Sequence, residues 1–395
     1  MSKDMRKLLI MNTISSIVAI YNGIFINLYI WEHEHSITEV SLYNMSMFVF
    51  WGISFLTATK LLSRFSIRLP LAVSAICGAA AFAYLMAFEL DNRMLWIALL
   101  GLPVGGMFGF SSASQNVSLT LRGRGAEFSA YFSVMMIISQ VLAMAVPFAA
   151  AQVINGFGYA GSFGLMLSFV ALMLGFSAFM PRITLAGATG EPRDPERGKF
   201  RFRAAFGYPG SKWILLSILV SGIFLQFQNL FTLLFTFTVT QDKLLIALLN
   251  MLYTCCSLLG LLLYRKVKSV DETKWLWFGM SLMAVGFVIV LFREPAALIL
   301  SNVLTSFGMF FFSTVWNAQQ FRFIQHAEPN GRASFLVWRE CTLVVTRCVL
   351  LGLTLPLKNM GGAGFAFVVS VTIVCVMLIP LFQQRAMRAA GKRRL

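Results

Sequence analysis

The sequence predicts an all-α membrane protein with twelve transmembrane helices, arranged as two six-helix bundles related by a pseudo-two-fold axis along the membrane normal. Three observations support this prediction: the composition, the number of long apolar segments, and a short motif that occurs once in each half. The composition is 58% hydrophobic and 12% charged, with a mean hydropathy of +0.76, whereas soluble domains carry roughly 25% charged residues. A chain this apolar is expected in a membrane.

A helix needs about 20 apolar residues to cross the bilayer, and twelve segments meet this requirement. They are 8–31, 37–58, 69–88, 94–117, 128–150, 159–180, 213–238, 244–264, 275–292, 296–318, 334–356 and 363–382. The first segment is too long and too rich in Asn and aromatic residues for a secretory signal, so we expect it to remain as a spanning helix.

One long polar interval separates the segments into two sets of six. It contains Pro192, Pro195 and residues of both charges, a composition typical of a linker. We therefore predict an N-terminal six-helix bundle over 1–180, a cytoplasmic linker over 181–212, and a C-terminal six-helix bundle with a basic cytoplasmic tail over 213–395.

A pentapeptide in the first segment returns in the seventh. The sequence GIFIN at 23–27 corresponds to GIFLQ at 222–226, so each copy places one carboxamide inside a membrane helix. An amide is costly there unless it has a partner or a substrate. The repeat therefore predicts a duplicated six-helix unit with a polar site near the middle of the membrane.

The net charge of +16 comes from basic residues in short loops and not from one stripe, so we expect no nucleic-acid partner. With a cytoplasmic N-terminus, nearly all 32 lysines and arginines face the cytoplasm. The exceptions are Arg93, Lys243, Arg293 and Lys358 on the outer side, and Arg339 and Arg347 inside the eleventh segment. The positive-inside rule then predicts a multi-pass protein of the cell (inner) membrane with both termini in the cytoplasm.

Twelve spans in a six-plus-six arrangement, a basic central loop and two cytoplasmic termini resemble the major facilitator superfamily. The family's loop after the second helix is similar to 59–68, which keeps Arg64 and Arg68, and the loop after the eighth is similar to 260–268, which keeps Arg265 and Lys268. The resemblance implies a secondary transporter working by alternating access, with these four basic residues in gating loops.

The fifth segment contains Val146-Pro147 and Ala150-Ala151, a partial match to the proline motif of exporters in that family. This match favours export, and proton-coupled uptake of an organic anion is the alternative. The stretch 187–190 lacks the GKS ending of a phosphate-binding loop, so a nucleotide-driven pump is not indicated. We expect a proton gradient as the driving force and no cofactor.

Glu340 is the one acidic residue well inside a predicted span, near Arg339 and Arg347. A buried carboxyl beside cations can change protonation with the access state, so we predict that Glu340 carries the coupling proton. Arg347 lies near the centre of its segment, where an arginine is costly, and we expect it to bind an anionic substrate group. A helix-positioning role for this cluster is the alternative. The predicted substrate is a small amphipathic anion or zwitterion.

Amides are enriched in the first, fourth, seventh and tenth segments, which line the cavity in the family that the chain resembles. We expect Asn27, Gln115, Gln226 and Asn317 to bind substrate, although a single amide is as often a partner for a neighbouring helix. The aromatic residues Phe25, Phe224, Phe231 and Trp316 could form apolar walls of the cavity, but in a chain with 38 Phe we expect each of them to be a lipid-facing or core residue.

The sequence contains no convincing metal or catalytic site. The six cysteines show no CxxC spacing, which argues against a disulfide framework or zinc site, and 32–35 (EHEH) is expected to be a solvated loop. No catalytic set lies at membrane depth, so we expect no enzyme activity. A non-transporting receptor or scaffold with a transporter fold is the alternative of another class. We expect a monomer whose partners are its substrate, protons and membrane lipid.

Overall fold

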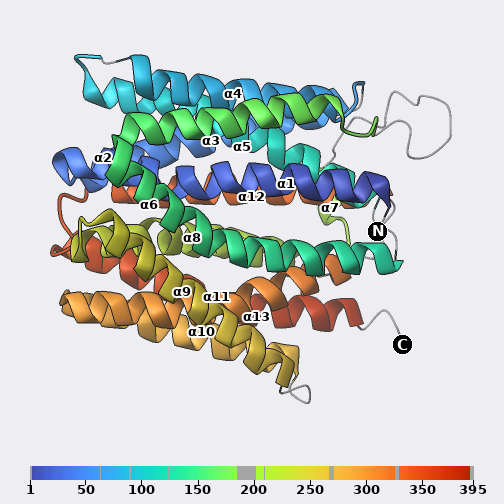
Figure 1. Ribbon diagram of the computed structural model, residues 1–395. Coiled ribbons are helices and arrows are strands. Elements are labelled where there is room, and N and C mark those ends of the chain that lie inside the picture. The colour runs from blue at the N-terminus through green and yellow to red at the C-terminus, as the bar shows by residue number, and fades with distance from the viewer. Residues whose placement is uncertain are drawn as a thin grey trace. The chain divides into compact units, whose positions relative to one another are not determined.

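The computed structural model describes residues 2–62, 64–88, 90–122, 125–184, 202–208, 210–266, 271–324 and 329–391. In this part of the chain the regular structure is helical (Figure 1). The elements are α1 (Lys3–Tyr21), η1 (Asn22–Ile26), α2 (Asn27–Glu34), α3 (Ile37–Leu62), α4 (Arg68–Ala87), α5 (Arg93–Arg122), α6 (Gly125–Ala178), α7 (Phe202–Phe206), α8 (Ser211–Val239), α9 (Lys243–Lys266), α10 (Glu272–Ile289), η4 (Val290–Phe292), α11 (Pro295–Ile324), α12 (Pro329–Thr354) and α13 (Ala363–Gly391).

The helices follow the predicted spans in order. Within the described residues, ten helical segments are long and apolar enough to cross a membrane. One of them, Val134–Ala178, contains the fifth and sixth predicted spans, which meet at Gly158 with φ 69°. The eleventh predicted span lies in α12, a helix of 26 residues that its three arginines and Glu340 make more polar than the others. The prediction of an all-α membrane protein is confirmed.

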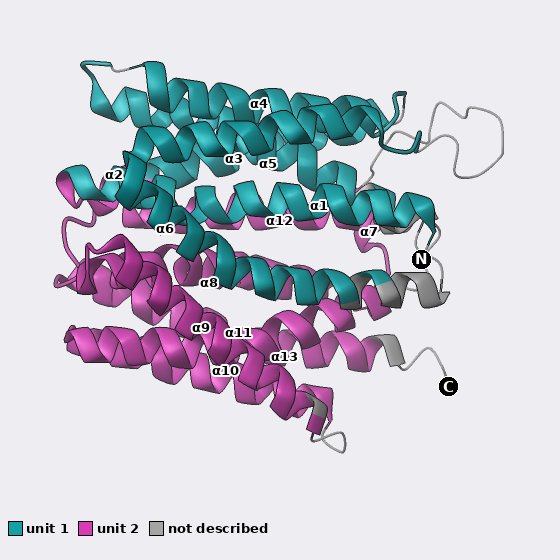
Figure 2. Ribbon diagram, in the orientation of Figure 1, with its two compact units in different colours: residues 1–33, 42–200 teal, residues 34–41, 201–395 magenta. Residues whose placement is uncertain are grey.

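The chain forms two compact units (Figure 2). Unit 1 comprises Met1–His33 and Leu42–Phe200, and unit 2 comprises Glu34–Ser41 and Arg201–Leu395. Unit 2 therefore includes the first turn of α3. There the Thr38 hydroxyl donates to the Leu355 carbonyl at 2.8 Å, and the hydroxyls of Ser41 and Thr354 lie 2.9 Å apart.

Unit 1 has a core in which α1 packs on α6, and α4 packs on both α5 and α6. Tyr21 of α1 is fully buried against Phe82 of α4 and Phe163 of α6, with ring centroids 6.1 and 6.4 Å away. Helix α5, which is the fourth predicted span, approaches α3 closely. A Cβ at Gly105 would lie only 2.2 Å from the Met47 carbonyl oxygen. Small residues permit this backbone approach in membranes.

Unit 2 repeats this pairing. Its first helix, α8, packs on α12 and α13, which carry its fifth and sixth spans, and α10 packs on α11 and α13. A column of aromatic rings runs along α8, with Phe227, Phe231 and Phe235 separated by 4.5 and 5.6 Å. In each unit the first helix contacts the fifth and sixth, and the third contacts the fourth and sixth. This agreement supports the duplication that the pentapeptide predicts.

Candidate functional site

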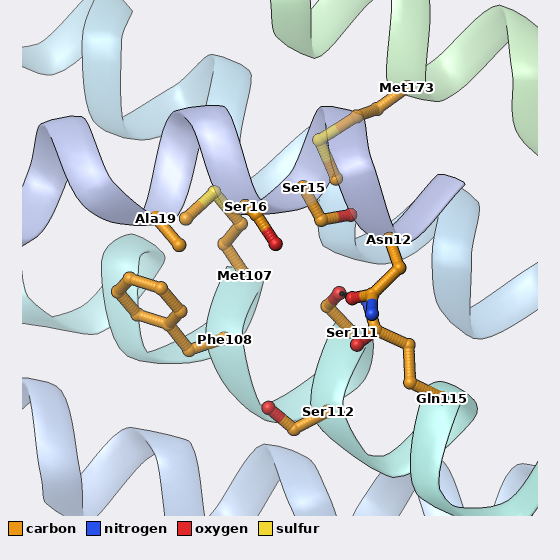
Figure 3. Close-up of a pocket in the computed structure, with 10 residues that line it drawn as sticks. All are labelled: Asn12, Ser15, Ser16, Ala19, Met107, Phe108, Ser111, Ser112, Gln115 and Met173. Atoms are coloured by element: carbon orange, nitrogen blue, oxygen red, sulfur yellow. Dashed lines mark hydrogen bonds between the residues drawn. The ribbon is translucent and has the colours of Figure 1, made fainter. Parts of the chain in front are cut away.

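A cavity of about 100 Å³ lies inside unit 1, between α1, α5 and α6. Figure 3 shows most of the polar side chains toward one end, where Met173 also lies, and most of the apolar ones toward the other, where Ser16 lies beside Met107. The polar end gathers Asn12, Ser15, Ser111 and Gln115, and the apolar end gathers Ala19, Met107 and Phe108. Ser16, Ser112 and Met173 complete the wall. We take this cavity as the candidate substrate site of unit 1.

Helical spacing explains why these side chains meet. The α1 residues are 12, 15, 16 and 19, and the α5 residues include 107, 108, 111, 112 and 115, so each set follows the i, i+3, i+4 spacing of one helix face. The two helices are antiparallel, so Asn12 lies next to Gln115 and Ala19 lies next to Met107. The polarity gradient of the cavity therefore follows the helix axes.

Partners within the cavity hold part of its polar end in place. Gln115 donates from Nε2 to the Ser111 hydroxyl at 3.1 Å, and Asn12 donates from Nδ2 to the Tyr131 hydroxyl at 3.4 Å. The Ser15 hydroxyl is buried without a hydrogen-bond partner. Gln115 was a predicted substrate residue, and it lines this cavity. Asn12 and the four serines were not predicted, although their spacing on α1 and α5 would have identified them.

Asn27, also a predicted substrate residue, is 3% exposed at the end of the π-helical element η1. Its Nδ2 donates to the Gly23 carbonyl at 2.8 Å, and its Oδ1 accepts from Nδ2 of Asn44 on α3 at 2.8 Å. The carboxamide thus supports a backbone carbonyl in a widened turn and joins two helices. This geometry favours the helix-packing alternative for Asn27.

Gln226, the counterpart of Asn27 in the repeat, is 1% exposed on the regular helix α8. Its Oε1 is buried without a hydrogen-bond partner. A buried acceptor that lacks a donor costs free energy, and a substrate donor would relieve that cost. The geometry therefore leaves Gln226 as a candidate substrate residue.

Asn317 of α11, a predicted substrate residue, and Arg339 of α12 form a polar contact between two helices of unit 2. Arg339 of α12 donates from Nη2 to Oδ1 of Asn317 at 2.6 Å, and its guanidinium lies 4.8 Å from the Trp316 ring centroid. Trp316 in turn donates from Nε1 to the hydroxyl of Ser217 on α8 at 3.0 Å. Stacking and a donor bond both fix the plane of the guanidinium.

Glu340 and Arg347 are both half-buried on α12. Glu340 interacts electrostatically with Arg339 and with Arg347, so the three predicted charges form one cluster. Arg347 has further interactions of its own. The roles that we predicted, proton carriage by Glu340 and anion binding by Arg347, remain predictions.

Unit 2 also contains an uncharged polar network that the sequence did not indicate. Asn302 of α11 donates from Nδ2 to the Thr232 carbonyl at 3.0 Å and to the Tyr253 hydroxyl at 3.2 Å. Gln228 donates from Nε2 to the hydroxyls of Thr232 and Thr305, at 2.9 Å each. The network connects α8, α9 and α11, and its contacts within the unit indicate a packing role.

Two of the four predicted gating residues can be placed. Arg68 donates from Nε to the Met180 carbonyl at 2.6 Å, beside Lys7, which donates to the Phe179 carbonyl at 3.0 Å. Both bonds satisfy carbonyls at the end of α6, where basic side chains are favourable. Arg64 is exposed. The side chain of Arg265 and the whole of Lys268 lie outside the described residues.

The four aromatic residues lie in the core and not toward lipid: Phe25, Phe224 and Phe231 are fully buried and Trp316 is 1% exposed. No group of three or more His, Cys, Asp or Glu residues that suits a metal ion occurs in the part of the chain that the structure describes. One acidic residue is almost completely buried: Glu39, in the first turn of α3, is 2% exposed.

Solved transporter structures share this fold over nearly the whole chain. A POT family transporter in complex with a thioalcohol-conjugated peptide matches with a TM-score of 0.73 at 12% identity, covering 97% of this chain and 96% of that one. The nucleoside transporter NupG matches with a TM-score of 0.69 at 13% identity, covering 98% and 99%. At this identity the likeness shows the fold, which is that of the major facilitator transporters.

Sequence comparisons add little to this result. No family model matches the chain. An uncharacterized protein, YqgE of Bacillus subtilis (strain 168), is 26% identical over 186 residues, which are 46% of this chain and 43% of that protein. The match thus spans less than half of the relative's length. The chain is a multi-pass membrane protein with a major facilitator fold.

Proposed function

We propose that this chain is a secondary active transporter that works by alternating access and carries a small amphipathic molecule. The single observation that carries the proposal is the cavity between α1 and α5, mostly polar at one end and mostly apolar at the other, in a chain with a transporter fold. Such a lining suits a solute with a polar group and an apolar body. The small-molecule cargo named for the similar structures, such as 5-aminolevulinic acid, supports the same class.

The charges of unit 2 support a substrate that is anionic or zwitterionic. Arg339 presents a guanidinium whose plane is fixed by Trp316 and Asn317. Arg347 adds a second positive charge on the same helix, and both arginines interact with Glu340. A guanidinium held in this way binds a carboxylate or phosphate with little loss of side-chain entropy. We assign the anion-binding role to Arg339 together with Arg347.

A proton gradient is the proposed driving force, and Glu340 is the proposed proton carrier. Glu340 is half-buried and interacts with both arginines, so an anionic substrate that binds to them competes with its carboxylate. Loss of these cationic partners favours the protonated carboxyl, so competition of this kind couples proton uptake by Glu340 to substrate binding. The proposed direction is export, on the partial proline motif around Pro147, and uptake of an organic anion is the alternative.

The distribution of basic residues supports cytoplasmic termini in the cell membrane. The chain ends and the interval 181–212 carry many of the 32 lysines and arginines, whereas only Arg93, Lys243, Arg293 and Lys358 lie in the loops of the opposite side. This bias fixes the orientation of membrane proteins. A monomer is proposed as the transporting species.

Proteoliposomes with an imposed pH difference test the transport proposal. The probe is radiolabelled N-acetylphenylalanine, an amphipathic carboxylate. One pH unit is worth about 1.4 kcal/mol per proton, so coupled movement of one proton per solute drives an accumulation of about tenfold. We expect Glu340→Gln to abolish accumulation while solute exchange at equal pH continues.

Two outcomes would reject this proposal. If the probe and its close analogues never cross the membrane with the wild-type protein, the receptor or scaffold alternative is favoured. If Glu340→Gln keeps full accumulation and changes only the melting temperature, Glu340 is a structural residue.

Arg339→Met tests the anion-binding role of Arg339. We expect this substitution to raise the KM for the carboxylate while the protein still folds.

A further inference from the structure

Two polar side chains of α1 and η1 are buried and have no hydrogen-bond partner among the residues that the structure describes. The Ser15 hydroxyl has none, and Asn22, which is 1% exposed, has none at either Nδ2 or Oδ1. Leucine has the same branching as asparagine and no polar atoms, so it would fit such a buried position at a lower cost. Folding stability therefore does not account for an asparagine at position 22.

Asn22 lies on the face of α1 that lines the cavity. Ser15, Ala19 and Asn22 follow one another at i, i+4 and i+7, a spacing that keeps side chains on one side of a helix. Ser15 and Ala19 both line the cavity. At a rise of about 1.5 Å per residue, Asn22 lies roughly 4.5 Å further along the axis than Ala19, just beyond the apolar end of the cavity.

The backbone at Asn22 can turn without breaking the helix. Asn22 is the first residue of η1, a π-helical element that holds one residue more per turn than an α-helix requires. A Cβ at the next residue, Gly23, would meet nothing within 4 Å. If this extra residue shifted to another position along the helix, the Asn22 side chain would rotate about the helix axis relative to the cavity.

The lining of the cavity sets the chemistry of its ligand. Its polar groups are the hydroxyls of four serines and the carboxamides of Asn12 and Gln115, and none of the residues that line it is charged. Hydroxyls and carboxamides both donate and accept hydrogen bonds. They suit an uncharged group that also does both, and Met107 and Phe108 suit an apolar or aromatic body next to it.

We propose that Asn22 and Ser15 complete the α1/α5 cavity when solute binds, and that this cavity takes the uncharged, hydrogen-bonding part of an amphipathic substrate, such as an amide or a set of hydroxyls. This proposal rests on the proposed transport function and adds the substrate group that unit 1 recognises. Asn22 is then a substrate-binding residue whose carboxamide is buried without a protein partner until the ligand arrives.

Thermal unfolding of the detergent-solubilised full chain tests the proposal with three matched probes. N-acetylphenylalanine carries a carboxylate, a phenyl ring and an uncharged amide. 3-Phenylpropionate keeps the carboxylate and ring without the amide, and N-acetylphenylalaninamide keeps the amide without the carboxylate. At millimolar concentration we expect the two amide probes to raise the melting temperature by about 2 °C more than 3-phenylpropionate does.

Asn22→Leu separates a binding role from a structural one. We expect it to raise the melting temperature without solute by about 1–2 °C, and to abolish the difference between the amide probes and 3-phenylpropionate. Ser15→Ala, which removes one hydroxyl only, should reduce that difference by about half. Ser221→Ala is the matched control, because Ser221 is the counterpart of Asn22 in the repeat and its hydroxyl is also buried without a partner, but on a regular helix. We expect this control to keep the full response to the amide probes.

The proposal is overturned if the three probes have the same effect on the wild-type protein, whether that effect is a shift or none. It is also overturned if Asn22→Leu and Ser15→Ala both keep the wild-type difference. Failure of transport is a separate result: if the amide probes stabilise the protein through Asn22 and yet none crosses a proteoliposome membrane, the cavity assignment stands and the transport function falls.

Discussion

The two copies of the repeated pentapeptide adopt different local structures. Residues 23–26 belong to the π-helical element η1 and Asn27 begins α2, whereas residues 222–226 lie within the regular helix α8. A Cβ at Gly23 would meet nothing within 4 Å, but a Cβ at Gly222 would lie 1.8 Å from the Thr346 hydroxyl oxygen. Close packing of α12 against α8 leaves no room for a widened turn, and open space beside Gly23 permits one.

The terminal amides differ for the same reason. In unit 1 the carboxamide of Asn27 bonds to the Gly23 carbonyl and to Asn44 of a second helix. In unit 2 the oxygen of Gln226 has no partner. One sequence pattern therefore gives a structural amide in the first half and an available one in the second, because the neighbouring helices decide what each carboxamide can reach.

Substitution of Asn27 should give the largest effect on stability. Asn27→Leu removes both hydrogen bonds, so the Gly23 carbonyl and the Asn44 amide each lose a buried partner, which we expect to lower the free energy of unfolding by about 2–4 kcal/mol. SDS titration of the purified protein measures this change. Asn250→Leu is the control, because Asn250 makes only the local bond to the Ile246 carbonyl and should cost much less. Equal costs for the two variants would contradict a two-helix role for Asn27.

Adding a methyl group at Gly222 should give the next largest effect. Gly222→Ala forces its Cβ against Thr346, and we expect a loss of about 1–3 kcal/mol from overpacking. A double-mutant cycle with Thr346→Ala checks the cause, since the second substitution should recover much of the loss. Strict additivity of the two changes would show that the contact with Thr346 is not responsible.

The same substitution at Gly23 should have the opposite sign. Gly23→Ala meets no atom within 4 Å, and alanine is favoured over glycine in a helix interior by about 0.5–1 kcal/mol. We expect the melting temperature to rise by a degree or two, on the order of what that free energy gives for a chain of this size. A Gly23→Ala protein as unstable as Gly222→Ala would remove the contrast between the two repeats.

Gln226 should show the smallest effect on stability. Gln226→Met keeps the length of the side chain and removes an oxygen that has no partner, so we expect the free energy of unfolding to change by less than about 1 kcal/mol. Uptake of N-acetylphenylalanine by proteoliposomes should nevertheless fall, because Gln226 is a predicted substrate residue. Lost stability together with unchanged uptake would assign it to helix packing instead.

The periodicity and composition of the chain were sufficient for the fold and for part of the candidate site. Long apolar segments predicted the order of the helices, and the polar residues within them included Gln115, which lines the cavity, and Asn317, which binds Arg339. Asn12, Ser15 and Ser112 were missed, because small polar side chains are common in membrane helices and only their shared face distinguishes them. The contact of Arg339 with Trp316 joins two helices, so no local pattern contains it.

The sequence by itself determined the class of the protein, because the cost of exposing polar groups to lipid restricts a chain of this composition to membrane-spanning helices, and the repeat indicated two similar halves. Tertiary structure decided which polar groups are satisfied and which remain open to a ligand. Partnership depends on the helix packed alongside, as Asn44 beside Asn27 and Thr346 beside Gly222 demonstrate. Asn22 and Ser15 acquire their significance in the same way, from an absence of partners that only the packed structure reveals.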